Sequence, residues 1–210
     1  ATLLGYYQKA DPPRTSDGDK LVSGAQSIDT LMKDPDWLVA QASWEVFRNQ
    51  PSKAVDDVRT AMKLAPKSSQ YVQSYLSVLL DTKNNSQLLS DTDAMIAANP
   101  NRWWIYQARG LARSAMHDAA RATGEFRQAF DLALADKDYA SADTVLTAMS
   151  RQHLVDAALQ LATPHVHENV RMAIAVARLS IQKGDQPGGL AVLNEAMGKV
   201  SSRPPDQQAM

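Results

Sequence analysis

The sequence predicts an all-α fold of antiparallel helix pairs, and two observations carry this prediction. The first is composition: the 210 residues include 32 alanines and eight methionines, while the alternating apolar pattern of half-buried strands is scarce. The second is a spacing of 34 residues between Pro66 and Pro100, each of which follows an apolar helical run. The carboxylates comprise 19 Asp and 4 Glu. Because Asp favours helix starts over helix interiors, we expect many of them at element boundaries.

The chain contains an internal repeat, which becomes visible when residues 35–68, 69–102 and 103–136 are aligned. Four columns of mostly apolar residues coincide: Ala54, Leu88 and Ala122; Val58, Thr92 and Phe126; Ala61, Met95 and Ala129; Leu64, Ala98 and Leu132. The eighth place of the three blocks holds Ala42, Leu76 and Gly110. Small residues allow two paired helices to approach closely. We therefore expect Ala54, Ala61, Ala122 and Ala129 to be buried between helices.

This pattern resembles the tetratricopeptide repeat, a helix–turn–helix unit with small residues at its eighth, twentieth and twenty-seventh places and a terminal proline. A shortened fourth block ends at Pro164, and a fifth fits residues 170–203. The resemblance implies a right-handed α-solenoid, a superhelix whose first helices line a concave groove. The alternative is a non-repetitive α-bundle with chance periodicity.

The segment before the repeats, residues 1–34, is expected to form leading helices that make a partial or degenerate repeat. Residues 1–10 are interpreted as the end of a helix and residues 11–18 as a loop. Residues 19–33 are predicted to form an amphipathic helix. Its apolar side would hold Leu21, Ala25, Ile28, Leu31 and Met32. Because the chain starts within an apparent helix and without Met, we interpret it as a segment of a longer protein or a processed one.

The solenoid is assigned to residues 35–203, and its turns are marked by helix-breaking residues. Pro51 and Pro187 suit the first turn of second helices, where a missing N–H costs nothing. The turns within pairs are assigned to Asn49, to Asn84 and Asn85, and to Gly184 and Asp185. A helix is expected over 138–150. The tail, rich in Ser, Pro and Gln, is predicted to be disordered over 204–210.

The first helices of blocks one and three fit their core better when the register is shifted back by one residue. Trp37, Ala40 and Trp44 then face inward, as do Ile105, Ala108 and Ala112. In the unshifted register Arg109 and Arg113 would be buried without evident partners, which is costly.

Composition and motifs exclude several classes of function. The 22 Lys and Arg against 23 Asp and Glu leave a net charge of −1, whereas nucleic-acid binders carry a basic surplus. No run approaches the length of a membrane-spanning helix. The absence of cysteine excludes disulfides, thiolate metal sites and cysteine nucleophiles. The compartment is left open between cytoplasm and periplasm.

No catalytic motif is found, so we expect neither an enzyme nor a cofactor. The chain has no phosphate-binding glycine loop, no Gly-x-Ser-x-Gly and no His-Glu-x-x-His. His165 and His167 could suggest a metal, but no third ligand is apparent nearby, and an exposed loop is the favoured interpretation. The carboxylate pairs Asp56–Asp57 and Asp91/Asp93 are interpreted as solvated helix faces.

The resemblance implies a groove for a partner peptide or helix, with contacts at fixed places of the first helices. In this sequence those places are Leu38, Glu45, Gln73, Ser77, Asp81, Trp103, Tyr106, Arg113 and Arg178. The groove lacks the Lys and Asn cluster with which chaperone-binding members hold a terminal carboxylate. Adjacent Trp103 and Trp104 cannot both face inward, so one of them should be at least partly exposed.

Three functions remain open. The favoured one is a module that binds another protein and scaffolds a larger assembly. The alternatives are a structural or self-associating segment of a larger envelope-export machine, and a non-catalytic arm of a larger enzyme. Exposed apolar surface on the terminal helices would favour self-association.

Overall fold

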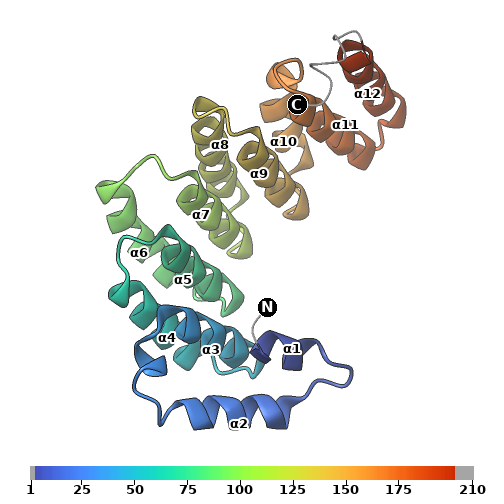
Figure 1. The fold of residues 1–210 in the computed structure, drawn as a ribbon. Coiled ribbons are helices and arrows are strands. Elements are labelled where there is room, and N and C mark those ends of the chain that lie inside the picture. Colours follow the sequence, from blue (N-terminus) through green and yellow to red (C-terminus); the bar gives the residue numbers. More distant parts are fainter. Residues whose placement is uncertain (1–2, 202–210) are drawn as a thin grey trace. The chain divides into compact units, whose positions relative to one another are not determined.

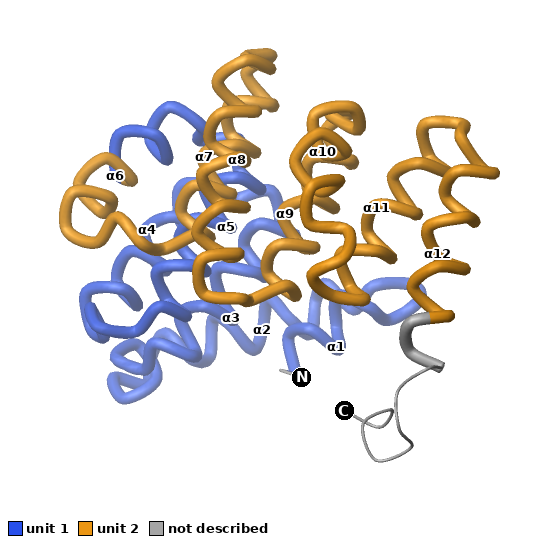
Figure 2. Tube along the Cα trace, turned by 90° about the horizontal axis from the view of Figure 1, so that it is seen from above, with its two compact units in different colours: residues 1–91 blue, residues 92–210 orange. Residues whose placement is uncertain are grey.

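The computed structural model describes residues 3–201, which form helices joined by turns and contain no strand (Figure 1). The chain divides into two compact units, residues 1–91 and residues 92–210, with the boundary inside one helix (Figure 2). The all-α class is thereby confirmed for the described residues. The predicted tail over 204–210 lies outside them.

The first unit is built from six helices and the beginning of a seventh. They are α1 (Leu3–Lys9), α2 (Thr15–Ala25), the 3₁₀ helix η1 (Leu31–Lys33), α3 (Pro35–Phe47), α4 (Pro51–Leu64), α5 (Ser69–Asp81) and α6 (Asn85–Ala98), of which α6 crosses the boundary. Helix α3 contacts α4 along its length and also packs against α1, η1 and α5. The predicted pairing of first and second helices is confirmed here.

The second unit continues the pairing. Its helices are α7 (Trp103–Ala115), α8 (Ala119–Ala135), α9 (Tyr139–Arg151), α10 (Val155–Ala162), the 3₁₀ helix η2 (Thr163–His165), α11 (Val170–Lys183) and α12 (Gln186–Ser201). The pairs α7–α8 and α11–α12 have the closest contacts in this unit. Pro187 lies in the first turn of α12, and Pro51 begins α4, as predicted.

The leading segment differs from its predicted boundaries. Helix α2 begins four residues earlier than expected and ends at Ala25 instead of continuing to residue 33. The hydroxyl of Ser27 donates to the backbone carbonyl of Gly24 at 2.8 Å, a local bond that competes with helix continuation. Ile28, assigned to the apolar side of the longer helix, is instead exposed.

Small residues lie where helices approach most closely. Ala54, Ala61, Ala122 and Ala129 are fully buried, which confirms the prediction for them. A Cβ on Gly110 would lie 2.8 Å from the ring of Phe126, so the eighth place of block three has no room for a side chain. These contacts explain why the repeat carries small residues at these places.

The shifted register is confirmed for most of the residues that it names. Ile105, Ala108 and Ala112 are buried in α7, and Ala40 and Trp44 are buried in α3, whereas Trp37 is half-buried.

Aspartate and asparagine side chains cap several helices, as the composition predicts. Asp34 accepts from the N–H of Asp36, Asp118 from that of Arg121, and Asp138 from that of Ser141. Asn169 caps α11 in the same way. The bonds from Ser141 lower the pKa of Asp138. The first helix turns are therefore fixed by short polar side chains.

Within residues 3–201, six helices end with a residue in the left-handed conformation. These residues are Asn49, Lys83, His117, Lys137, His153 and Gly184. After each of them the next N–H reaches back to the carbonyl five residues earlier, as Asp138 N does to Ala133 O at 2.9 Å. This is the Schellman arrangement. The second turn is made by Lys83, whereas the sequence placed it at Asn84 and Asn85, and Asn85 instead begins α6.

A row of buried polar contacts repeats with the 34-residue period, and we call these contacts the polar rungs. Each rung joins the seventh place of a first helix to an acid at the twenty-third place of the second helix. The rungs are Gln41 to Asp57 at 2.6 Å, Tyr75 to Asp91 at 2.5 Å and Arg109 to Glu125 at 2.8 Å. The sequence analysis missed them, although the acids at 57, 91 and 125 share the repeat spacing.

The rungs correct two expectations about charged residues. Asp57 and Asp91 are half-buried acceptors and do not lie on solvated faces, whereas Asp56 and Asp93 are largely exposed. Arg109 does point inward, with a side chain only 12% exposed. Its burial is tolerated because its N–H groups donate hydrogen bonds to Glu125, Asp93 and Thr92.

Candidate protein-binding face

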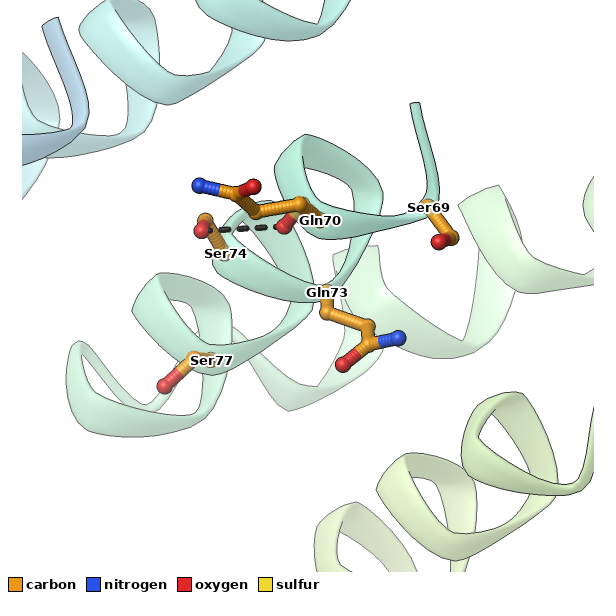
Figure 3. A pocket seen from close by; sticks show the side chains of 5 residues that line it. All are labelled: Ser69, Gln70, Gln73, Ser74 and Ser77. Atoms are coloured by element: carbon orange, nitrogen blue, oxygen red, sulfur yellow. Dashed lines mark hydrogen bonds between the residues drawn. The ribbon is translucent and has the colours of Figure 1, made fainter. Parts of the chain in front are cut away.

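Helix α5 presents a face of small, uncharged polar side chains, which we call the α5 polar row. The row consists of Ser69, Gln70, Gln73, Ser74 and Ser77 (Figure 3). The opposite face of the helix is buried through Val72, Tyr75, Leu76, Val78 and Leu79. The alternation of polar and apolar residues every three to four positions therefore both anchors α5 and exposes the row.

The row lines a shallow depression of about 500 Å³. Ser74 Oγ donates to the carbonyl of Gln70 at 3.0 Å, so this hydroxyl is occupied within the helix. Gln73 and Ser77 are exposed, lie one helical turn apart, and project from the helix surface in Figure 3. An amide offers both donors and acceptors, so this pair can bond to a peptide backbone in either direction.

Three of the residues expected at the groove lie along this one helix. Gln73, Ser77 and Asp81 follow one another at intervals of four residues, and all three are exposed. Asp81 is the last residue of α5 and adds a carboxylate at the end of the row. The structure thus brings together the three candidates from block two.

The two candidates from block one are not available to a partner. Leu38 is 1% exposed and Glu45 is 5% exposed. Helix α3 is covered by α1, η1, α4 and α5, so little of its surface remains free. Because they are buried in this way, we assign Leu38 to the core and treat Glu45 as a buried polar group.

The candidates on α7 are partly buried in the second unit. Trp103 and Tyr106 pack against its hydrophobic core, which includes Phe126 and Phe130. Arg113 has a side chain 20% exposed, and its Nη1 lies 3.8 Å from a carboxylate oxygen of Asp118. These side chains share the inter-helix packing and are half-buried, whereas Gln73 and Ser77 of the α5 polar row are exposed.

Both adjacent tryptophans of α7 are half-buried, which agrees with the expectation that at least one would be partly exposed. The guanidinium of Arg102 lies 5.5 Å from the ring centre of Trp104, a cation–π contact at the start of the helix.

Arg178 is exposed on α11 but already has a partner. Its guanidinium lies 2.7 Å from Asp143 on α9, which joins the two helices. On the same side of α11, Ile174 and Ile181 are 50% and 42% exposed. The sequence analysis did not select them, although their seven-residue spacing places them on one helix face.

Within residues 3–201, no three His, Asp or Glu side chains lie together in an arrangement that could hold a metal ion. His165 Nδ1 lies 2.7 Å from Glu168, and its ring meets the edge of Phe130. In the same range, each helix is too short or too polar to cross a bilayer.

Comparison with known proteins places the chain in a family. The family model described as "Tetratricopeptide repeat" matches residues 15–127. No curated protein sequence matches the chain. A solved structure that matches is a chain of the crystal structure of the APC/C hetero-tetramer Cut9–Hcn1. The match has 13% identity and a TM-score of 0.45, covers 93% of this chain and spans 43% of that one. On the family match over more than half of its length, the chain belongs to the tetratricopeptide repeat family.

Proposed function

We propose that the chain is a protein-interaction module that holds an extended segment of a partner protein along the α5 polar row. Tetratricopeptide repeats serve protein–protein interaction in general, which supports the class of function. The observation that carries the site is the pair Gln73 and Ser77, which is exposed and makes no side-chain hydrogen bond within the described residues.

The chemistry of the row favours backbone recognition. Extended peptides present N–H and C=O groups that need partners, and amide and hydroxyl side chains supply both kinds. Because the row itself carries no charge, binding should depend little on salt. Asp81 at the end of the helix would favour a basic side chain at that end of the peptide.

The aromatic and cationic groups of α7, which belong to the second unit, are a separate candidate contact. Trp103, Tyr106 and Arg113 are the residue types enriched in binding hot spots. Their partial burial means that substitution would also remove packing in the second unit. The row on α5 is therefore the cleaner test of binding.

The test replaces Gln73 and Ser77, two exposed side chains in the middle and at the end of the row. Peptides selected on the intact protein from a displayed random library would serve as probes. We expect Gln73→Ala with Ser77→Ala to weaken probe binding by at least about 1 kcal/mol, measured by fluorescence anisotropy, with unchanged melting. Ser52→Ala, an exposed hydroxyl on α4, is the control and should bind like the parent. Unchanged affinity of the double variant would reject the row as the site.

A second function, self-association, is favoured by a different observation. The two terminal helices expose apolar side chains: Leu3 and Tyr6 on α1, and Leu190 and Met197 on α12. Exposed apolar side chains that lie together on a helix indicate a contact surface.

A further inference from the structure

The first polar rung contains a second buried acid, Glu45, beside Asp57. Glu45 lies on α3 and Asp57 on α4, the two helices with the closest contacts in the first unit. Glu45 is only 5% exposed, and its Oε2 has no hydrogen-bond partner among the described residues. A buried carboxylate without partners is costly, so the protonated form is favoured there.

The neighbouring side chains fix which group carries the proton. The indole N–H of Trp37 donates to Gln41 Oε1 at 3.0 Å, which leaves the Gln41 amide N–H₂ to face Asp57. That amide donates to Asp57 Oδ2 at 2.6 Å, a contact that favours ionised Asp57. Glu45 lies one helical turn after Gln41 on the same face of α3, which places its carboxyl on the side of the helix that contacts Asp57, and only a protonated Glu45 can donate to a carboxylate.

Electrostatics agree with this assignment. Burial, and then the Asp57 carboxylate, raise the pKa of Glu45 from its ordinary value to about 8. Burial also raises the pKa of Asp57. Ionising both carboxyls costs a large free energy because they are close together and little water surrounds them. Near neutral pH the pair therefore binds one proton more than it would in the unfolded chain.

We propose that Glu45 and Asp57 form a proton-dependent clasp between α3 and α4, which is closed while the pair shares one proton and is weakened when that proton is lost. The clasp makes the stability of the first unit depend on pH near neutrality. It is independent of any partner and does not rest on the proposed function.

Few other charges act on the clasp. From α4, Lys53 favours the ionised forms and Asp56 opposes ionisation of Asp57. Titratable groups on the other elements around α3 have other partners or are exposed. Tyr71 bonds to Asp36 and Tyr75 to Asp91, while Lys33 lies near Asp29 and Arg48 near Asp19. Tyr7 stacks with Arg14, and Lys9 and Asp81 are exposed. The pH response should therefore come from the pair itself.

The direction of the response follows from linkage. Because the folded pKa of Glu45 lies above its unfolded value, the folded state binds more protons between pH 4.5 and about 8. The stabilisation is fully present below the lower value and is lost as the pH rises through the upper one. The first unit should thus be more stable at pH 5.5 than at pH 8.5.

A carboxyl titration of the full chain tests the clasp directly. In ¹³C NMR, we expect the Glu45 carboxyl to titrate near pH 8. Titration of Glu45 near its ordinary value of 4.5 would overturn the proposal.

Hydrogen exchange provides the second test, with intrinsic rates corrected for pH. For amides of α3 and α4 we expect the opening constant to rise by about tenfold or more between pH 5.5 and 8.5, while α7 and α8 serve as an internal reference. Glu45→Gln should remove most of that rise, and Asp56→Asn, an exposed acid beside Asp57, should retain it. The same rise in Glu45→Gln as in the parent would refute the clasp. If Glu45→Gln does not fold, Asp57→Asn should lower the titration point of Glu45, and an unshifted titration would refute it equally.

Discussion

Ala61 and Ala129 occupy equivalent places in two second helices, and each is fully buried against its paired helix. Interiors are packed about as densely as organic crystals, so an added isobutyl group has no space to enter. The small side chain at these places is therefore a geometric requirement of the helix pair. A larger residue would displace the helices or adopt an unfavourable rotamer.

Substituting Ala61 or Ala129 with Leu tests this requirement. We expect each change to lower the free energy of unfolding by about 1–3 kcal/mol through overpacking. Urea denaturation would measure the loss. Ala120→Leu, an exposed position on α8, is the matched control and should have little effect. Parent-like stability of both buried variants would contradict the close approach of the helices.

Residue type predicted burial well for apolar side chains and less well for polar ones. Small and apolar columns follow from the repeat spacing alone, because burial of such residues needs no specific partner. Asp57 and Arg109 were misplaced because their burial depends on a side chain 16 residues away on another helix. Leu38 was assigned to the groove from the places that the family uses for binding, whereas in this chain it is buried where α3 packs against its neighbouring helices.

At the scale of elements, the first helices of the repeats end in the same way, with a left-handed residue and a Schellman hydrogen bond. The Schellman turns that follow α3, α5 and α7 are spaced by 34 residues, at Asn49, Lys83 and His117. A proline or a short polar residue then begins the next helix. The helix pairs were predictable because these signals are local in sequence. The boundaries of α2 were not, because its end depends on the hydroxyl of Ser27.

The turns also predict a stabilising substitution. Lys137 has φ 55°, a region that costs a residue with a Cβ about 1–2 kcal/mol. Lys137→Gly should raise the free energy of unfolding by about 0.5–1 kcal/mol, because part of that gain is offset by greater backbone entropy in the unfolded chain. The measurement is urea denaturation at fixed pH. Gly184→Ala, at φ 100°, should act in the opposite direction, and stabilisation by this second change would refute the argument.

At the scale of the whole molecule, each unit has its own buried core and its own candidate contact. The first unit carries the α5 polar row and the carboxyl clasp, and the second unit exposes Ile174 and Ile181 on α11. The repeat pattern predicted the helix pairs of both units. Of the residues proposed for the groove, Gln73, Ser77 and Asp81 lie on the exposed face of α5. Leu38 and Glu45 are buried, so the repeat pattern located only part of the accessible surface.

The terminal helices lead to a prediction about assembly. Leu190 and Met197 lie seven residues apart, on one face of α12, and are 47% and 67% exposed. An exposed apolar face stabilises contact with another apolar surface, and copies of the chain would then associate. We expect sedimentation velocity to show that the fraction of associated chains rises as the protein concentration is raised over about a hundredfold range. Leu190→Lys with Met197→Lys should abolish it, whereas Leu64→Lys, an equally exposed apolar position on α4, should not. A parent that stays monomeric over the whole range would exclude self-association through α12.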